Sequence, residues 1–218
     1  MKLLGASSPS SASTAAERRV TILPPDMARL TAMTLPVNIV PVAHRLVRCN
    51  RTNSKPLVFG PAPGDPPSFR FHPPAHQFGV CYFADTAFGA FAETFLRDVP
   101  VCSISMVELG ARSFTEVAVQ RPLRLVDLHG PGLAQLGTTA GLATVLPCDV
   151  TWLWSLALWQ HADAVDGLQY RCRHDSDEMA TALFDRAQRA LKVEETTPAL
   201  ANHARLAAIL QRHRVSLL

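Results

Sequence analysis

The hydrophobic pattern just before the middle of the chain predicts a strand that leads directly into a helix. Residues 80–84 (VCYFA) are apolar, with aromatic and β-branched side chains, which is typical of a buried strand. Asp85 and Thr86 follow, and their side-chain oxygens can cap the free N–H groups at a helix start. Apolar residues then recur at helical spacing over residues 87–96, where Glu93 is the single acid. We therefore expect a helix whose apolar stretch contains one carboxylate.

The same periodicity predicts the remaining strands and the fold class. Strands are expected over residues 44–49, 101–109, 113–119, 123–128, 167–173 and 179–184. A long loop rich in Pro, Gly and Asn, over residues 50–67, is of a kind that often binds ligands. Because strands and helices mix without regular βαβ alternation, we predict an α+β fold, a compact mixed sheet flanked by helices.

Helices are predicted in three further regions. Residues 129–146 indicate short helices that cover one side of the sheet. A longer helix follows Asp149 as its N-cap, with a core-facing stripe that consists of Trp152, Leu156 and Trp159. Thr197 and Pro198 suit the N-cap and first turn of a last helix, which we expect to end near His213.

Residues 1–37 are rich in Ser, Ala and Thr and lack strand or helix periodicity. We therefore predict a flexible N-terminal extension, followed by one domain over residues 38–218. The first residues contain too few consecutive apolar positions for a secretory signal, which needs about 7–15 of them. No uninterrupted run reaches the roughly 20 apolar residues of a membrane-spanning helix, so we expect no membrane association.

Charge and cysteine content narrow the class of protein further. The net charge is +3 over 218 residues, which does not indicate nucleic acid or an anionic membrane as a direct partner. The five cysteines are odd in number and form no C-x-x-C pair, which argues against a disulfide framework or a zinc knuckle. This cysteine content fits a reducing cytoplasm, where we expect the protein to act.

Three side chains around the predicted strand and helix bring different chemistry together. Arg70 lies between two phenylalanines, Tyr82 is in the strand and Glu93 is in the helix. Each has an ordinary explanation, as a surface charge, a core aromatic residue and a solvated acid. As a set, a cation, a flat π-face and an anion suit a ligand that carries phosphate, a ring and developing positive charge.

Four motifs, in this order and spacing, resemble the RES-domain family. They are F-R-F-H-P-P at residues 69–74, G-V-C-Y-F-A at 79–84, A-F-A-E-T at 90–94 and G-L-Q-Y-R-C-R-H-D at 167–175. The family takes its name from an arginine, a glutamate and a serine. Arg70 and Glu93 match the first two, and Tyr82 matches the strand tyrosine of the family. Cys172 stands where the family has serine, which is a departure from the pattern.

The resemblance implies a fold similar to that of ADP-ribosyltransferase toxins and an activity that consumes NAD. NAD would be the substrate, with neither a metal nor a prosthetic group, and Arg70, Glu93 and Cys172 would be catalytic. Members of the family are described as cleaving NAD with water or phosphate, and at least one type as modifying a protein. Many are toxins paired with a helix-turn-helix (Xre-type) antitoxin. We therefore expect a NAD-degrading toxin or, as an alternative, a protein ADP-ribosyltransferase.

The residue types suit this chemistry. No G-x-G-x-x-G follows a strand and no P-loop is present, so a Rossmann or P-loop enzyme is not supported. Breaking the nicotinamide–ribose bond gives the ribose oxocarbenium character, which Glu93 can stabilise. Arg70 offers a fork of donors for a diphosphate, and Tyr82 offers a ring on which nicotinamide can stack. Arg48 and Arg45 offer a second phosphate contact for NAD.

The predicted strand at residues 167–173 allows a different chemistry. Alternation places Tyr170, Cys172 and His174 on one face and Arg171 and Arg173 on the other. A cysteine–histidine nucleophile on the first face is geometrically conceivable, although no oxyanion-loop signature accompanies it.

Two further interpretations stay open. His72 and His76 lie on one proline-containing loop, but no third ligand motif accompanies them for zinc. The Cys172 thiol is a weaker hydrogen-bond donor than a serine hydroxyl, so we expect activity to be lowered rather than lost. A catalytically weakened module that binds NAD or a protein partner is the corresponding non-enzymatic alternative.

Overall fold

Eight strands form one mixed sheet in the computed structural model, which describes residues 22–97 and 101–218. The strands are β1 (Val37–Val40), β2 (Arg45–Arg51), β3 (Val80–Ala84), β5 (Arg112–Val119), β6 (Leu123–Asp127), β7 (Gly167–Cys172), β8 (Asp175–Phe184) and β9 (Leu191–Thr196). They pair in the order β1-β6-β7-β8-β3-β2-β5-β9. Neighbours are antiparallel except β6 and β7, which run parallel. The short strands β4 (Ser103–Ile104) and β10 (Ser216–Leu217) form a separate parallel pair.

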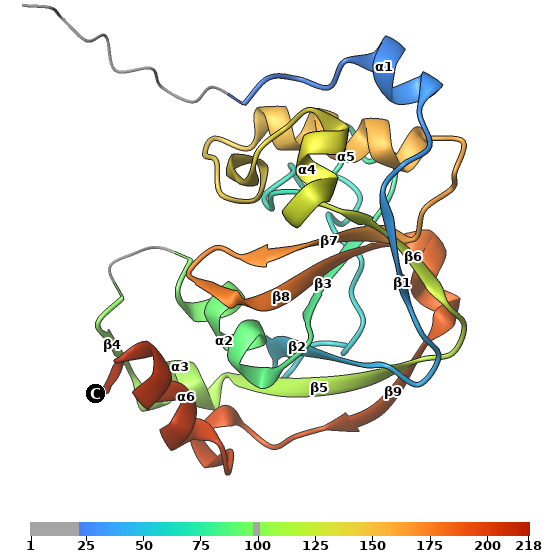
Figure 1. Cartoon of the computed structure of the whole chain (residues 1–218). Coiled ribbons are helices and arrows are strands. Elements are labelled where there is room, and N and C mark those ends of the chain that lie inside the picture. The colour runs from blue at the N-terminus through green and yellow to red at the C-terminus, as the bar shows by residue number, and fades with distance from the viewer. Residues whose placement is uncertain (1–21, 98–100) are drawn as a thin grey trace, which may run out of the picture.

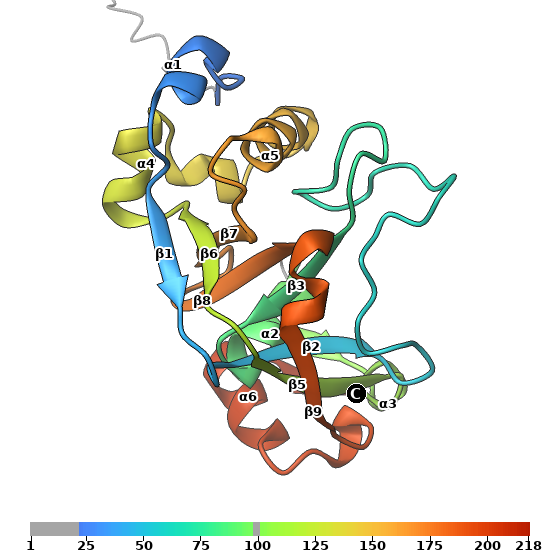
Figure 2. The ribbon, with the colours of Figure 1, turned by 90° about the vertical axis from the view of Figure 1, so that its right-hand side faces the viewer.

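The helices gather in two groups (Figure 1; Figure 2). The first group consists of α1 (Met27–Ala32), α4 (Gly130–Leu136) and α5 (Asp149–Gln160), and the second of α2 (Ala87–Phe95), α3 (Met106–Gly110) and α6 (Leu206–His213). Short 3-10 helices add η1 (Ala140–Ala143), η2 (Asp185–Ala190) and η3 (Leu200–Asn202). In the described ranges no helix has the length and apolar character needed to cross a membrane. The mixed sheet flanked by helices confirms the predicted α+β fold.

Three clusters of buried side chains hold the sheet and helices together. The first packs α1, α4 and α5 against the sheet and includes Phe71 and Tyr170. The second joins α2, α3 and α6 to β2 and β5 and includes Phe91. The third lies on the other face of β3, where Phe83 alternates with Tyr82 of the first cluster. Burial of each large apolar side chain contributes about 1.5–3 kcal/mol, so these clusters fix the elements that surround the site.

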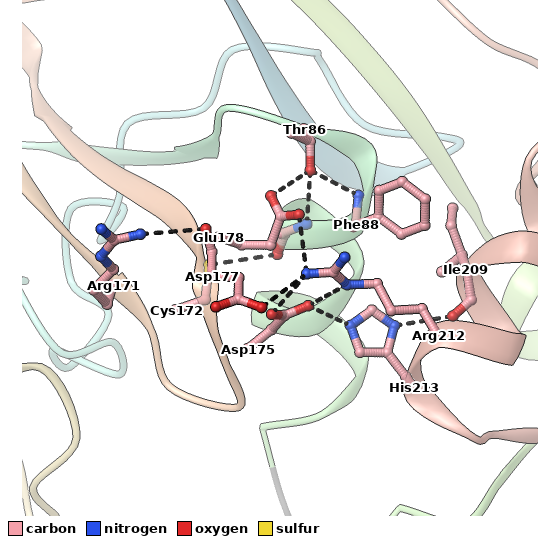
Figure 3. Close-up of polar contacts among 11 residues, drawn as sticks. Thr86, Phe88, Arg171, Cys172, Asp175, Asp177, Glu178, Ile209, Arg212 and His213 are labelled. Atoms are coloured by element: carbon pink, nitrogen blue, oxygen red, sulfur yellow. Dashed lines mark hydrogen bonds and ion pairs between the residues drawn. The ribbon is translucent and has the colours of Figure 1, made fainter.

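Helix α2 begins where the sequence predicts. Thr86 is its N-cap, and Oγ1 of Thr86 accepts hydrogen bonds from the N–H groups of Phe88 (3.1 Å) and Gly89 (3.2 Å). The same hydroxyl donates to Glu178 Oε2 on β8 at 2.6 Å (Figure 3). Gly89 lies close to the sheet: a Cβ at this position would be 3.2 Å from Glu178 Cβ and 3.4 Å from Cys172 Sγ. The helix therefore packs tightly against β7 and β8.

A charged cluster links α6 to the hairpin of β7 and β8 (Figure 3). Nε and Nη2 of Arg212 donate to the two carboxylate oxygens of Asp175 at 2.7 and 3.0 Å. These bonds hold the pKa of Asp175 below its usual value. His213 Nε2 lies 3.1 Å from the same carboxylate, and Arg212 Nη2 lies 3.4 Å from Glu178 Oε1. Because Glu178 contacts both Arg212 and Thr86, the cluster connects α6 to the start of α2.

The predicted strand over residues 101–109 is wrong. Strand β4 has only two residues, and a helix, α3, follows it. Ser105 and Glu108 form a capping box: Ser105 Oγ accepts from the N–H of Glu108, and Glu108 Oε2 accepts from the N–H of Ser105, both at 3.2 Å. These bonds satisfy two backbone donors at a helix start, which outweighs the alternating apolar pattern.

Helix α5 differs from its prediction at its cap and on its buried face. The N-cap residue is Cys148, and Asp149 is the first residue of the helix. The predicted core stripe of Trp152, Leu156 and Trp159 is only partly buried. The buried side chains of the helix are instead those of Thr151, Trp154, Ser155, Ala157 and Leu158. Polar Thr151 and Ser155 fit this face because their hydroxyls donate to the backbone carbonyls of the loop that carries Arg70.

The last helix is shorter than predicted. A 3-10 turn, η3, comes first, and α6 begins at Leu206 and ends at His213 as expected. Thr197 is not its N-cap, because Oγ1 of Thr197 accepts from the N–H of Phe114 on β5 at 3.1 Å.

Residues 22–36 pack against the rest of the protein. Ile22, Leu30 and Leu35 are buried in the first cluster. Trp154 Nε1 donates to the carbonyl of Leu23 at 2.8 Å, which ties this segment to α5. The segment thus differs from the flexible extension predicted for residues 1–37, whose first 21 residues lie outside the described ranges. Helix propensity alone is weak in so short a segment, so packing accounts for its order.

Replacing Leu30 by Ala tests this packing. Leu30 is 3% exposed, so Leu30→Ala should lower the free energy of unfolding by about 2–5 kcal/mol. Leu23 is 69% exposed, and the matched control Leu23→Ala should change it by less than about 0.5 kcal/mol. Urea unfolding of both variants measures the difference. Equal midpoints would contradict a structural role for this segment.

Candidate active site

A cavity of about 560 Å³ lies where α2, the end of β7 and the long loop between β2 and β3 meet. Figure 2 shows this loop leaving the sheet beside β2 and returning into β3. Four of the predicted site residues line the cavity: Arg48 from β2, Arg70 from the loop, Tyr82 from β3 and Glu93 from α2. The fold therefore brings together side chains that are up to 45 residues apart in the sequence.

Positive charge dominates the lining of this cavity. Among the described residues Glu93 is its single acid, whereas its arginines are Arg48, Arg51, Arg70, Arg97, Arg112 and Arg173. The arginines that form ion pairs in the described ranges are others, namely Arg45, Arg121 and Arg212. Guanidinium groups gathered in a concave site favour an anion with several acceptor oxygens.

The carboxylate of Glu93 is held in place by β7 and the turn that follows it. Tyr170 donates its O–H to Glu93 Oε2 at 3.3 Å, and the backbone N–H of Arg173 donates to Glu93 Oε1 at 3.0 Å. Burial, together with the neighbouring charge of Glu93, raises the pKa of Tyr170, so its phenol stays protonated and remains a donor. Two donors directed at the two oxygens fix the orientation of the carboxylate.

Aromatic rings form another part of the lining. The hydroxyl of Tyr82 accepts a hydrogen bond from the N–H of Phe71 at 3.0 Å, and burial raises the pKa of Tyr82. The ring of Phe69 lies 5.8 Å from that of Tyr82, and the guanidinium of Arg97 lies 4.5 Å over Phe69. Arg70 stands beside these rings and donates to the carbonyl of Val145 at 3.4 Å. Flat ring faces next to guanidinium groups suit a ligand with both a ring and phosphate.

Buried polar atoms without partners concentrate around the same cavity. In the described ranges six buried side-chain N or O atoms lack a hydrogen bond, and three belong to residues of the lining: Arg48 Nε, His72 Nε2 and His174 Nε2. Burial, then the charges of Arg97 and His76, lowers the pKa of His72 to about 4. Its Nδ1 accepts from the N–H of Ser68, so neutral His72 carries its proton on the unpartnered Nε2. Unsatisfied buried polar atoms are rare, so these three atoms have hydrogen-bonding capacity to offer to a molecule in the cavity.

Two predicted residues are not in the cavity lining. The guanidinium of Arg45 is exposed and donates to Glu116 Oε2 at 3.0 Å. Cys172 is 2% exposed, and its thiol lies 3.9 Å from the carbonyl oxygen of Gly89 on α2. Neither side chain lies at the cavity surface. The role of Arg45 in NAD binding and that of Cys172 in catalysis stay predictions.

The alternative chemistries find little geometric support. Burial, then the nearby charges of Glu93 and Glu178, raises the pKa of Cys172, which disfavours a nucleophilic thiolate. Burial, then the charge of Arg173, lowers the pKa of His174. In the described ranges no three His, Cys, Asp or Glu side chains come together as metal ligands, so His72 and His76 gain no third partner there.

The sequence pattern did not indicate several residues that line the cavity. Arg173 and His174 form the turn between β7 and β8, where strand alternation no longer applies, and both line the cavity. Arg51 and Arg112 come together through the pairing of β2 with β5, which the sequence does not specify. Arg97 follows Glu93 by four positions, but α2 ends at Phe95, so helical periodicity does not place this side chain in the cavity.

Comparisons with known proteins agree with the four motifs. The RES domain model matches residues 43–206. A probable toxin of Sinorhizobium fredii, y4kH, is 35% identical over 107 residues, which cover 49% of this chain and 84% of that protein. A chain in the crystal structure of the M. tuberculosis MbcT–MbcA toxin–antitoxin complex has a similar fold, with a TM-score of 0.63 and 15% identity over 86% of this chain and 96% of that chain. The resemblance drawn from the sequence is confirmed: the chain belongs to the RES domain family.

Proposed function

We propose that this protein is the toxin of a toxin–antitoxin system and acts by breaking the nicotinamide–ribose bond of NAD. The observation that carries the proposal is one oriented carboxylate, Glu93, in a cavity lined by six arginines. The similarity to a probable toxin and to a toxin–antitoxin complex supports the biological role. We propose the cytoplasm as its site of action and a helix-turn-helix protein as its antitoxin.

In the proposed reaction the bond between ribose C1′ and the pyridinium nitrogen breaks. Its electron pair moves to the nitrogen, which leaves as neutral nicotinamide, and C1′ gains oxocarbenium character. The ionised Glu93 stabilises this developing positive charge. Its two hydrogen bonds, from β7 and from the turn after it, hold the carboxylate in position before the reaction, so little reorganisation is needed at the transition state.

The remaining lining supplies binding. Arg70 and Arg48 present donors for the diphosphate, which carries the negative charge of NAD. Tyr82 and Phe69 offer ring faces to the nicotinamide. Water or phosphate then forms the new bond to C1′, and a water nucleophile releases its proton to the solvent. The positive lining gives a phosphate acceptor a favourable environment. NAD is the substrate, and no prosthetic group enters the proposal.

Replacing Glu93 by Gln tests the catalytic role. Glu93→Gln keeps the shape but removes the charge, so release of nicotinamide should fall by on the order of 100-fold or more. Affinity for NAD should change little, because the carboxylate acts mainly in the transition state. Chromatography of nicotinamide, with and without added phosphate, measures turnover, and calorimetry measures affinity.

Glu195→Gln is the matched control. It makes the same change of side chain at a residue that is exposed on β9 and lies outside the cavity. It should keep full turnover. Wild-type protein that leaves NAD intact under both conditions would refute the proposed function. Undiminished turnover in Glu93→Gln would remove Glu93 from the mechanism.

Replacing Cys172 by Ser separates two roles of this position. The thiol is a weak donor that lies beside the Gly89 carbonyl, and a serine hydroxyl is a stronger one. Cys172→Ser should therefore retain or raise the rate of NAD cleavage. A cysteine nucleophile would require the opposite, so a collapse of activity in a variant with unchanged melting temperature would contradict this assignment.

A further inference from the structure

Two arginines of the cavity face each other across neighbouring strands. Arg51 ends β2, Arg112 begins β5, and the two are direct partners in the antiparallel register. Residues in this relation have Cβ atoms about 4.5–5.5 Å apart and point to the same face of the sheet. Both line the cavity, so their guanidinium groups can converge on one small anion within it.

No acid in the described part of the chain forms an ion pair with Arg51 or Arg112, so their positive charges are not neutralised there. Like charges directly opposite each other destabilise an antiparallel pair. The arginines that form ion pairs within residues 22–97 and 101–218 are Arg45, Arg121 and Arg212. The single described acid of the cavity, Glu93, is directed to β7. An anion that accepts hydrogen bonds from both Arg51 and Arg112 would relieve their repulsion.

The position of the pair indicates which part of a substrate it meets. Glu93 is held against β7, and the strands β8 and β3 lie between β7 and β2 in the sheet. A phosphate that attacks ribose C1′ must stand beside Glu93. Arg51 and Arg112 line the cavity from β2 and β5, which are separated in the sheet order from the end of β7 that holds Glu93, and we assign the remote end of a bound dinucleotide to this part of the lining.

We infer that Arg51 and Arg112 bind a phosphate monoester on the adenosine ribose, which makes NADP the preferred substrate. The inference rests on the proposed cleavage of the nicotinamide–ribose bond and specifies its substrate. NADP differs from NAD by the 2′-phosphate, a dianionic group with three acceptor oxygens. Two guanidinium forks match such a group with several charge-assisted hydrogen bonds, whereas a ribose hydroxyl leaves both charges unpaired.

The test compares NADP with NAD in the full-length protein and in Arg51→Gln and Arg112→Gln. Wild-type kcat/KM for NADP should exceed that for NAD by about 10-fold or more. Each variant should lower kcat/KM for NADP by roughly 10- to 100-fold and that for NAD by less than about threefold. Arg124→Gln, exposed on β6 and outside the cavity lining, is the matched control and should leave both values unchanged.

Three results would overturn the inference. One is a wild-type protein without preference for NADP, and another is an equal loss with both dinucleotides in the variants. The third is loss of phosphate stimulation with NAD while the NADP preference remains, because the pair would then bind the attacking phosphate. The melting temperature of each variant shows whether it is folded. If one variant does not fold, the other still tests the inference.

A binding experiment separates this inference from the proposed function. Adenosine 2′,5′-bisphosphate cannot undergo the reaction, and calorimetry can compare its affinity with that of adenosine 5′-monophosphate. Tighter binding of the bisphosphate by about 10-fold, lost in Arg112→Gln, supports the subsite even where neither dinucleotide is cleaved. Equal affinity of the two nucleotides refutes the subsite, even where NAD is cleaved.

Discussion

The two hydrogen bonds that Glu93 accepts from Tyr170 of β7 and from Arg173 in the turn after it are the constraint on which the cavity depends. They bind the last turn of α2 to the end of a strand, while Thr86 fixes the first turn to Glu178 on β8. The helix is thus held at both ends, and the carboxylate cannot turn away without losing both donors. The cluster of Arg212 extends the same restraint to α6, so distant parts of the chain help to keep Glu93 oriented.

The charged lining of the cavity lowers the free energy of unfolding when no ligand is bound. Six arginines with one described acid repel each other, and His72 and Arg48 leave buried donors unpaired. Such features lower stability unless a ligand satisfies them, and they concentrate where a protein binds or reacts with its substrate. The three hydrophobic clusters lie around this region, and their burial offsets the repulsion.

The sequence alone was sufficient for features that depend on local patterns. The strand β3 and the cap and helix of α2 follow from consecutive residues, and the motifs around Arg70, Tyr82 and Glu93 identified the family. Features that depend on pairing between distant segments were not predictable. Arg173 lines the cavity from the turn between β7 and β8, and the segment around Leu30 packs in the first cluster together with α4 and α5. The capping box of Ser105 was visible in the sequence but competed with an alternating pattern that indicated a strand.

The contact between Gly89 and Cys172 has a consequence for how this site can evolve. A Cβ at Gly89 would lie 3.0 Å from Ala84 Cβ, 3.2 Å from Glu178 Cβ and 3.4 Å from the sulfur of the buried Cys172, so this part of the interface is closely packed. A bulkier residue at either place would push α2 away from β7 and carry Glu93 with it. The size of the side chain therefore limits position 172 more than its hydrogen bonding does, and serine and cysteine are both small enough. An exchange between them is a step that the lineage can take without dismantling the site.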